Sequence, residues 1–231
     1  MNQVPAILRR LDDWNAVLAL AALGFSVGLG SALPSALLGF ASLLAFGAVC
    51  RPRQARFAGL GLANALTLLR LLIAFIASLL FWQAPSLLAA GAAIVLLLDG
   101  LDGWAARRLG EASAFGAYFD METDAYLILM LCLALYLAGG LGAWALLPGA
   151  LRYVFVVARR WNGERSVPER RSQFGRVAFV TLALSLLLAC VAPLRAISAA
   201  LVGVGLVAVS ISFTPDFLAL IQGARAGVER G

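Results

Sequence analysis

Long apolar runs alternate with short polar segments along this chain. A bilayer-spanning helix needs roughly 20 mostly apolar residues, and the chain has enough apolar sequence for several such spans. The runs predict eight helices, over residues 14–30, 34–50, 61–82, 86–98, 125–138, 144–157, 177–191 and 197–213. The pattern therefore predicts an all-α fold, a polytopic membrane helical bundle.

Most arginines fall between these runs. If both termini lie inside, the outer turns hold only Arg195. The inner segments then hold Arg51, Arg53, Arg56, Arg107, Arg108, Arg159, Arg160, Arg165, Arg170, Arg171 and Arg176. Such an asymmetry is typical of a multi-pass protein with cytoplasmic basic loops. We expect the cell membrane as its location, which in a bacterium is the inner membrane.

Composition supports this interpretation and excludes several chemistries. Hydrophobic residues make up 62% of the chain and charged residues 13%, and the mean hydropathy is +0.93, whereas a soluble domain is about half apolar and a quarter charged. The chain has no His and no Lys, so histidine catalysis and Schiff-base chemistry are excluded. The net charge of +6 is attributed to topology and to attraction for anionic lipid and phosphates, with no nucleic acid expected.

A cleaved signal peptide is the competing interpretation of the first run. It would require a small-residue cleavage site soon after that run. Asp12 and Asp13 precede the run and a second apolar run follows it directly, which favours a retained hairpin.

Four aspartates follow the fourth run at helical spacing. Asp99 and Asp102 are three residues apart, and Asp120 and Asp124 are four apart, so each pair lies on one face of its helix. The short connection through Gly110 predicts that the two helices are antiparallel neighbours. All four carboxylates can then converge near the cytoplasmic surface.

A bound cation would relieve both the repulsion among these carboxylates and the cost of placing them in a membrane. Hard divalent cations prefer carboxylate oxygen, so we expect Mg²⁺ or Mn²⁺, and four carboxylates can hold two ions for phosphoryl chemistry. Gly103 and Gly116 would let a bulky ligand approach the helix backbones, and Arg107 suits a phosphate oxygen. Helix capping alone explains Asp99 and Asp102 poorly, because the helix dipole disfavours negative charge at a C-terminal end.

The segment from Asp99 to Asp124 reads Asp-x-x-Asp-Gly-x-x-Ala-Arg-x8-Gly-x3-Asp-x3-Asp. It resembles the signature of the CDP-alcohol phosphatidyltransferases without a departure. Upstream, Asn64, Thr67 and Arg70 are similar to the family's entry helix. Downstream, the looser matches are Arg152, Arg160 and Arg176, the last of which is more often Lys in the family.

The resemblance implies a donor, usually CDP-diacylglycerol, whose lipid-side phosphorus is attacked by the hydroxyl of a small polar acceptor alcohol while CMP leaves. Asp99, Asp102 and Asp120 would hold divalent metal, and Asp124 would be a metal-adjacent general base. The nucleotide and diphosphate site would be shaped by Gly103, Ala106, Arg107 and Gly116. The resemblance also implies a homodimer surrounded by membrane lipid.

The domain prediction follows from the extent of this resemblance. We expect an N-terminal transmembrane hairpin with a basic loop over residues 1–58, a six-helix catalytic core over 59–214 and a cytoplasmic tail over 215–231. The hairpin lies outside the family's usual core, and its role stays open.

The acceptor-side residues carry two interpretations each. Arg152, Arg160 and Arg176 could form a pocket for a phosphate on the acceptor, whereas Arg152 could also make an ion pair within a span, since a charge there is costly unless used. Asn64, Thr67 and Arg70 could bind substrate, or simply satisfy a helix end or snorkel.

The alternative function is a divalent-cation transporter that uses the acidic cluster. Transporters usually place polar or broken segments near the bilayer midplane, whereas these acids lie at one surface. An inactive scaffold is disfavoured by the intact set of four aspartates. The identity of the acceptor alcohol stays open.

Overall fold

The described residues form helices joined by turns. The structure, a computed structural model, describes the backbone of residues 6–50, 61–80, 85–110, 113–138, 141–161, 173–191 and 195–228, and the side chains of 8–48, 61–80, 87–101, 108–110, 113–138, 141–161, 175–191, 196–215, 217 and 218. The elements are α1 (Ala6–Leu29), α2 (Leu33–Cys50), α3 (Leu62–Leu80), α4 (Pro85–Leu109), α5 (Ala114–Leu137), the 3-10 helix η1 (Ala143–Leu146), α6 (Leu147–Trp161), α7 (Gln173–Val191) and α8 (Arg195–Val228). The all-α prediction is confirmed.

Several helices continue beyond the apolar runs that predicted them. α1 begins at Ala6, before the run at 14, and α4 continues through the aspartates to Leu109. α8 continues through Pro215 to Val228, across the predicted start of the tail. Hydropathy locates only the apolar part of a helix, so its polar ends are missed.

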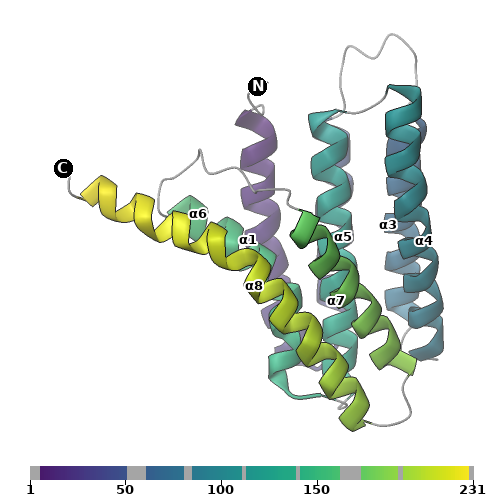
Figure 1. The fold of residues 1–231 in the computed structure, drawn as a ribbon. Coiled ribbons are helices and arrows are strands. Elements are labelled where there is room, and N and C mark those ends of the chain that lie inside the picture. The colour runs from purple at the N-terminus through teal and green to yellow at the C-terminus, as the bar shows by residue number, and fades with distance from the viewer. Residues whose placement is uncertain are drawn as a thin grey trace.

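α5 is the central helix of the bundle (Figure 1). It packs against α1, α2, α3, α6, α7 and η1, and every side chain from Ala125 to Leu135 is buried. A helix that is covered on all sides is expected to be apolar all round, and this stretch contains only apolar residues and Tyr126. Figure 1 also shows α8 leaning across the bundle toward the C-terminus.

The N-terminal hairpin of α1 and α2 packs directly on the rest of the bundle. α1 lies against α6, and α2 lies against α5 and α3. The rings of Phe40 and Phe75 stack with centroids 4.1 Å apart, and the Tyr126 hydroxyl donates to the Ala36 carbonyl at 3.2 Å. Gly39 makes room for Tyr126, since a Cβ there would lie 2.7 Å from a ring carbon. The hairpin therefore shares the core of the bundle.

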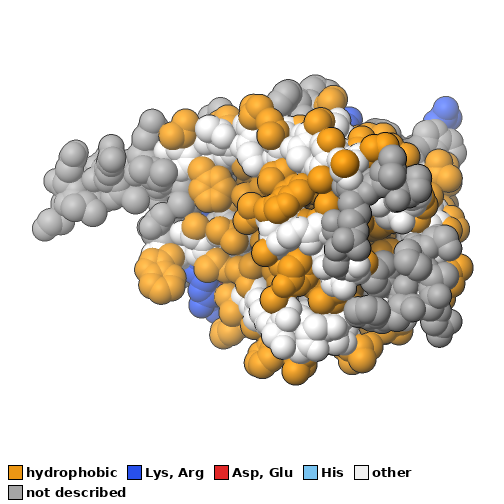
Figure 2. All heavy atoms as spheres, turned by 90° about the horizontal axis from the view of Figure 1, so that it is seen from below, with side chains coloured by type: hydrophobic (Ala, Val, Ile, Leu, Met, Phe, Trp, Pro, Cys, Tyr) orange, Lys and Arg blue, Asp and Glu red, His pale blue; other side chains and the backbone are white. Residues whose placement is uncertain are grey.

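The outer surface is rich in large apolar side chains. Leu97 is 75% exposed, Leu29 70% and Phe25 63%, and hydrophobic side chains predominate over charged ones on the face shown in Figure 2. Soluble monomers rarely expose extensive apolar patches. Two helices are long and apolar enough to cross a membrane, Leu62–Leu80 and Ala196–Pro215, with mean hydropathies of 2.0 and 2.2. The predicted number of spans stays a prediction.

Candidate functional site

Three of the four predicted aspartates come together in the fold. One carboxylate oxygen from each of Asp99, Asp120 and Asp124 lies within 4.8 Å of the others. Asp99 comes from α4, and the other two come from successive turns of α5. Their side chains are 36%, 34% and 18% exposed, so the cluster is open to a ligand from one side.

Four further predicted residues lie on α4 just beyond Asp99. The side chains of Asp102, Gly103, Ala106 and Arg107 are outside the described residues, although their backbone is helical. Their predicted roles stay predictions.

Arg70 of α3 holds the aspartate cluster together. Its side chain is fully buried, and its Nη2 lies 2.9 Å from Asp99 Oδ1. Its Nη1 lies 2.7 Å from Asp120 Oδ1, and it also forms an ion pair with Asp124. Arg70 therefore contacts the predicted metal ligands themselves.

α3 is also the helix that joins the two acidic helices. It packs against both α4 and α5, whereas over the described residues α4 and α5 make few close contacts with each other. The predicted convergence of acidic side chains from α4 and α5 is present for Asp99, Asp120 and Asp124, and direct packing of the two helices stays a prediction, because the side chains of residues 102–107 lie outside the described residues. A buried, unpaired arginine is strongly unfavourable. The ion pairs of Arg70 with carboxylates on α4 and α5 therefore stabilise the packing of both helices against α3.

The donor set of the cluster fits a divalent cation. Three carboxylates converge on one guanidinium, so carboxylate oxygens predominate among the polar atoms of the cluster. Mg²⁺ and Mn²⁺ prefer oxygen donors of this type, whereas structural zinc sites are usually built from Cys and His. The residues present therefore suit the metal that the sequence predicted.

Asn64 and Gly116 lie next to each other, each about two helical turns or less from a residue of this cluster in sequence. A Cβ on Gly116 would come within 2.8 Å of Asn64 Oδ1. The Gly116 N–H donates to Ser113 Oγ at 3.0 Å, which caps the start of α5. Asn64 thus faces the first turn of α5, and Arg70 faces the turns that carry the aspartates, so α3 and α5 run in the same direction.

Thr67 lies between these two levels of α3. It is buried, and its hydroxyl donates to the Ala63 carbonyl at 3.2 Å within the helix. The spacing of Asn64, Thr67 and Arg70 thus places a polar stripe of α3 beside α5.

Arg176 stands in the first turn of α7 and is exposed. α7 packs against α4, which carries Asp99. Arg176 is therefore the acceptor-side arginine whose helix packs against the helix of Asp99.

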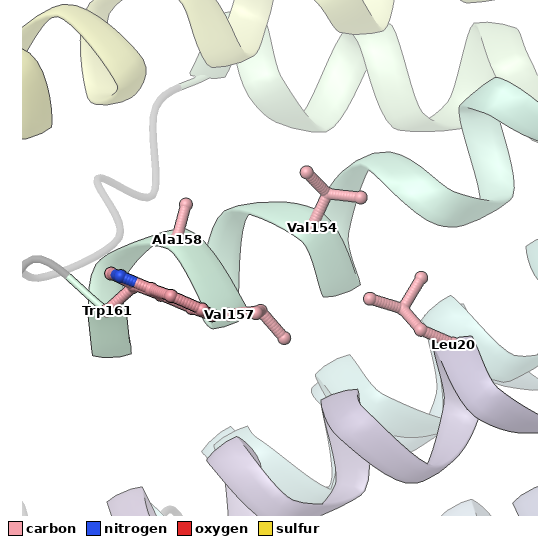
Figure 3. Close-up of a pocket in the computed structure, with 5 residues that line it drawn as sticks. All are labelled: Leu20, Val154, Val157, Ala158 and Trp161. Carbon is pink, nitrogen blue, oxygen red and sulfur yellow. The ribbon is translucent and has the colours of Figure 1, made fainter.

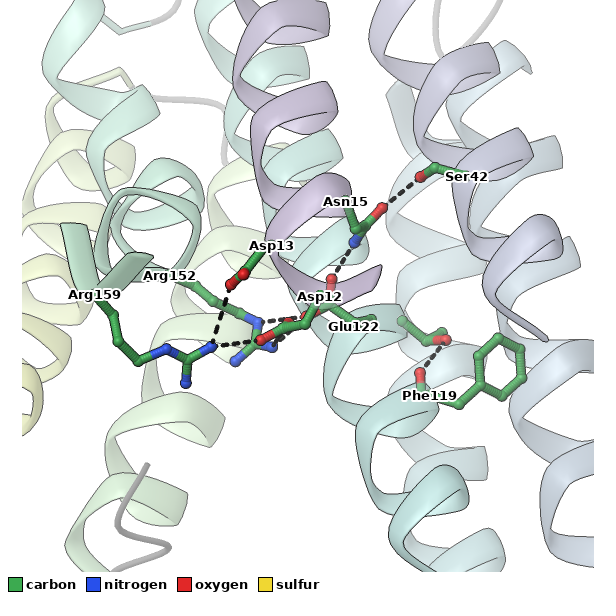
Figure 4. Close-up of polar contacts among 9 residues, drawn as sticks. Asp12, Asp13, Asn15, Ser42, Phe119, Glu122, Arg152 and Arg159 are labelled. Atoms are coloured by element: carbon green, nitrogen blue, oxygen red, sulfur yellow. Dashed lines mark hydrogen bonds and ion pairs between the residues drawn. The ribbon is translucent and has the colours of Figure 1, made fainter. Parts of the chain in front are cut away.

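Arg152 belongs to a second, buried polar cluster (Figure 4). Its Nε donates to Glu122 Oε1 at 3.0 Å, and its Nη2 lies 3.3 Å from Asp12 Oδ1. Arg159 Nη2 donates to the other oxygen of Asp12 at 2.9 Å. The four side chains are at most 11% exposed. The structure thus places Arg152 in the internal ion pair that the sequence left open.

Arg160 lies at the rim of this second cluster. Its Nη1 is 3.6 Å from Asp13 Oδ2, and its guanidinium lies over the Trp14 ring, 5.4 Å from the centroid. Arg152 and Arg160 therefore contact α1, whereas Arg176 stands on α7, so these contacts do not unite the three arginines in one pocket.

Sequence reasoning missed four members of the second cluster, Asp12, Asn15, Glu122 and Arg159. One signal was available for Glu122, which lies two residues from both Asp120 and Asp124. At about 100° per residue it must point away from them. A second signal was Arg152 itself, because an arginine within an apolar run is usually paired with an acidic side chain.

An apolar groove between α1 and α6 is separate from both clusters (Figure 3). Its volume is about 340 Å³, and it is lined by Leu20, Val154, Val157, Ala158 and Trp161. None of these side chains is titratable, so the groove has no groups for catalysis.

Comparison with known proteins identifies one family. The family model described as CDP-alcohol phosphatidyltransferase matches residues 60–214. This region contains α3 to α7, most of α8 and the complete aspartate cluster, but not the hairpin of α1 and α2. No solved structure matches the chain.

Proposed function

The chain belongs to the CDP-alcohol phosphatidyltransferase family, and we propose that it transfers a phosphatidyl group from CDP-diacylglycerol to the hydroxyl of a small polar alcohol. Members of this family are membrane-associated transferases of phospholipid synthesis that use CDP-alcohols. The observation that carries the proposal is the convergence of Asp99, Asp120 and Asp124, whose oxygens lie within 4.8 Å of one another.

The proposed reaction balances as a single displacement at phosphorus. The acceptor oxygen forms a bond to the lipid-side phosphorus, and the bond from that phosphorus to the bridging oxygen breaks. CMP leaves with the bonding electron pair. The hydroxyl proton passes to Asp124, which is the least exposed of the three described carboxylates, at 18%.

The other aspartates are proposed as metal ligands. Asp99, Asp102 and Asp120 would hold Mg²⁺ or Mn²⁺, with two ions expected when Asp102 and the substrate diphosphate complete the donor set. Bound metal supplies neutralisation of the diphosphate charge. Arg70 keeps Asp120 and Asp124 directed at the site, because its two terminal nitrogens contact them separately.

Substrate contacts are proposed for the residues around this cluster. Gly103, Ala106, Arg107 and Gly116 would shape the nucleotide and diphosphate site, with Asn64 and Thr67 beside them. Among the acceptor-side arginines, Arg176 is retained as a substrate contact because α7 packs against α4, which carries Asp99. Arg152 and Arg160 have acidic partners within the protein, which favours an internal role for them.

The membrane arrangement is part of the proposal. We place the chain as a multi-pass, homodimeric protein of the bacterial inner membrane, with the aspartates at the cytoplasmic face. The distribution of arginines and the exposed apolar surface support this placement. A transporter is less well supported, because the second polar cluster is buried and internally paired.

The test is acceptor-dependent release of CMP. Purified protein in detergent with Mg²⁺ and CDP-diacylglycerol is incubated with glycerol 3-phosphate, inositol, inositol phosphate, serine or choline. We expect release with one of these acceptors, and no turnover by Asp124→Asn, which should still bind the donor. Asp13→Asn is the charge-matched control and should release CMP as the wild type does, since Asp13 lies on α1, 3.8 Å from Arg159 and 3.6 Å from Arg160, and is not part of the aspartate cluster. Absence of CMP with every acceptor, with Mn²⁺ as well, refutes the proposal.

A further inference from the structure

We propose that the N-terminal hairpin is a working part of the catalytic core, because Asp12 and Asn15 act through Glu122 to position the helix that carries Asp120 and Asp124. This inference rests on the proposed function for its catalytic meaning. The hairpin lies outside the region matched by the family model, residues 60–214, so membership of the family does not account for it.

The first argument is the position of Glu122 on α5. It lies between Asp120 and Asp124 in sequence and points to the opposite side of the helix. Arg70 contacts the aspartates on one side, and Arg152 contacts Glu122 on the other. The same two turns of α5 are thus held by arginines from α3 and from α6.

The second argument is the contribution of the hairpin to this contact. The Asn15 amide donates to Glu122 Oε2, and Asn15 in turn accepts a hydrogen bond from Ser42 of α2. Figure 4 shows Asn15 between Ser42 and Glu122. Glu122 therefore has partners from both the core and the hairpin.

The third argument is charge balance. Glu122 pairs with Arg152, whereas the carboxylates that pair with the buried Arg159, those of Asp12 and Asp13, both come from the hairpin. Asp12 contacts both arginines, at 3.3 and 2.9 Å. An uncompensated buried charge is strongly unfavourable, so α6 and α5 can keep their observed positions only with α1 in place.

A positional role follows because catalysis tolerates little displacement. A misplacement of about 1 Å far from the reacting atoms can lower a rate by about 10²-fold. The α5 carboxylates can share a metal with Asp99 only while their oxygens stay close to the Asp99 oxygen, which now lies within 4.8 Å of both. Rotation or sliding of α5 after loss of the Glu122 contacts would separate them.

The experiment compares Asp12→Asn and Glu122→Gln with Ser26→Ala in the full-length protein. Ser26 is a matched control within the hairpin, because its hydroxyl donates to Ser35 Oγ at 2.9 Å and this buried bond lies at the other end of α1. Mn²⁺ binding is measured by electron paramagnetic resonance, thermal unfolding by circular dichroism, and kcat and KM by CMP release. Ser42→Ala, which removes one contact to Asn15, is the milder variant if the others do not fold.

We expect Asp12→Asn and Glu122→Gln to weaken Mn²⁺ binding about tenfold and to lower kcat about 10–100-fold, with a smaller change in donor KM. Ser26→Ala should lower Tm and leave Mn²⁺ binding unchanged. Asp12→Glu, which keeps the charge, should recover part of the loss. For Ser42→Ala we expect the same direction and a smaller effect.

Two outcomes overturn the inference. One is that the variants lower Tm as Ser26→Ala does while keeping wild-type Mn²⁺ affinity, since the hairpin would then only add stability. The other is that the wild type binds no Mn²⁺. If the wild type binds Mn²⁺ but releases no CMP with any acceptor, the proposed function fails, and the binding comparison still decides whether the hairpin positions α5.

Discussion

Adding a methyl group to Gly116 should show whether this residue serves to make room for Asn64. A Cβ at position 116 would lie 2.8 Å from Asn64 Oδ1 and 3.2 Å from Ser113 Oγ. Both distances are shorter than ordinary van der Waals contact, and the shorter one requires a shift of roughly half an ångström. Because the Asn64 oxygen ends a short side chain, we expect Asn64 to be displaced from the position facing α5.

The magnitude follows from two opposing effects. Overpacking costs about 1–3 kcal/mol, whereas replacing a helical Gly by Ala gains up to about 1 kcal/mol. In an Asn64→Ala background the shorter contact disappears, and the helical gain is opposed only by the 3.2 Å approach to Ser113 Oγ. The coupling between the two substitutions is therefore about 1–3 kcal/mol, which for a chain of this size corresponds to about 2–12 °C in Tm.

The assay is a double-mutant cycle followed by thermal unfolding and by CMP release. Gly116→Ala should lower Tm in the wild type and raise it in Asn64→Ala, and its activity should resemble that of Asn64→Ala. Gly24→Ala is the control, because a Cβ there meets no heavy atom within 4 Å, and its effect should be the same in both backgrounds. Equal effects of Gly116→Ala in both backgrounds would refute the reasoning.

Three further outcomes are expected. Ser113→Ala removes the cap on the Gly116 N–H and should lower stability by about 1 kcal/mol, seen as a fall in Tm; an unchanged Tm contradicts it. Tyr126→Phe leaves the buried Ala36 carbonyl without this donor and should cost about 1–3 kcal/mol by the same measurement; a stability equal to the wild type would show that the bond contributes nothing. Chelation with EDTA should abolish CMP release and added Mg²⁺ or Mn²⁺ should restore it, whereas full activity in EDTA would exclude a metal role for the aspartates.

The aspartate cluster could be predicted because its signal is local. Asp120 and Asp124 are one turn apart, and Asp99 ends the preceding apolar run, so helical geometry alone places each on a shared face. The ion pairs with Arg70 that join the three aspartates could not be predicted in the same way. Arg70 is distant in sequence from its three partners, and periodicity says nothing about contacts between helices.

The second polar cluster was even less predictable from the sequence, because its members are farther apart along the chain. Asp12 and Arg152 are separated by 140 positions, and no repeat or spacing links them. Asp12 informed only the interpretation of the first apolar run as a retained helix. The cost of burying Arg152 correctly indicated that its guanidinium has a negatively charged partner. An acidic side chain and a substrate phosphate would both serve as that partner. Only the packing of α1 against α6 identifies the partner.

The proposed transfer at the aspartate cluster is tested most directly by identifying the phosphorus products of CDP-diacylglycerol by ³¹P NMR. With Mg²⁺ and the correct acceptor, we predict that the diphosphate signals are replaced by those of CMP and a new phosphodiester, at equal rates, and that Asp124→Asn produces neither. Formation of CMP with phosphatidic acid in place of the phosphodiester, or an unchanged product pattern in Asp124→Asn, would contradict the account.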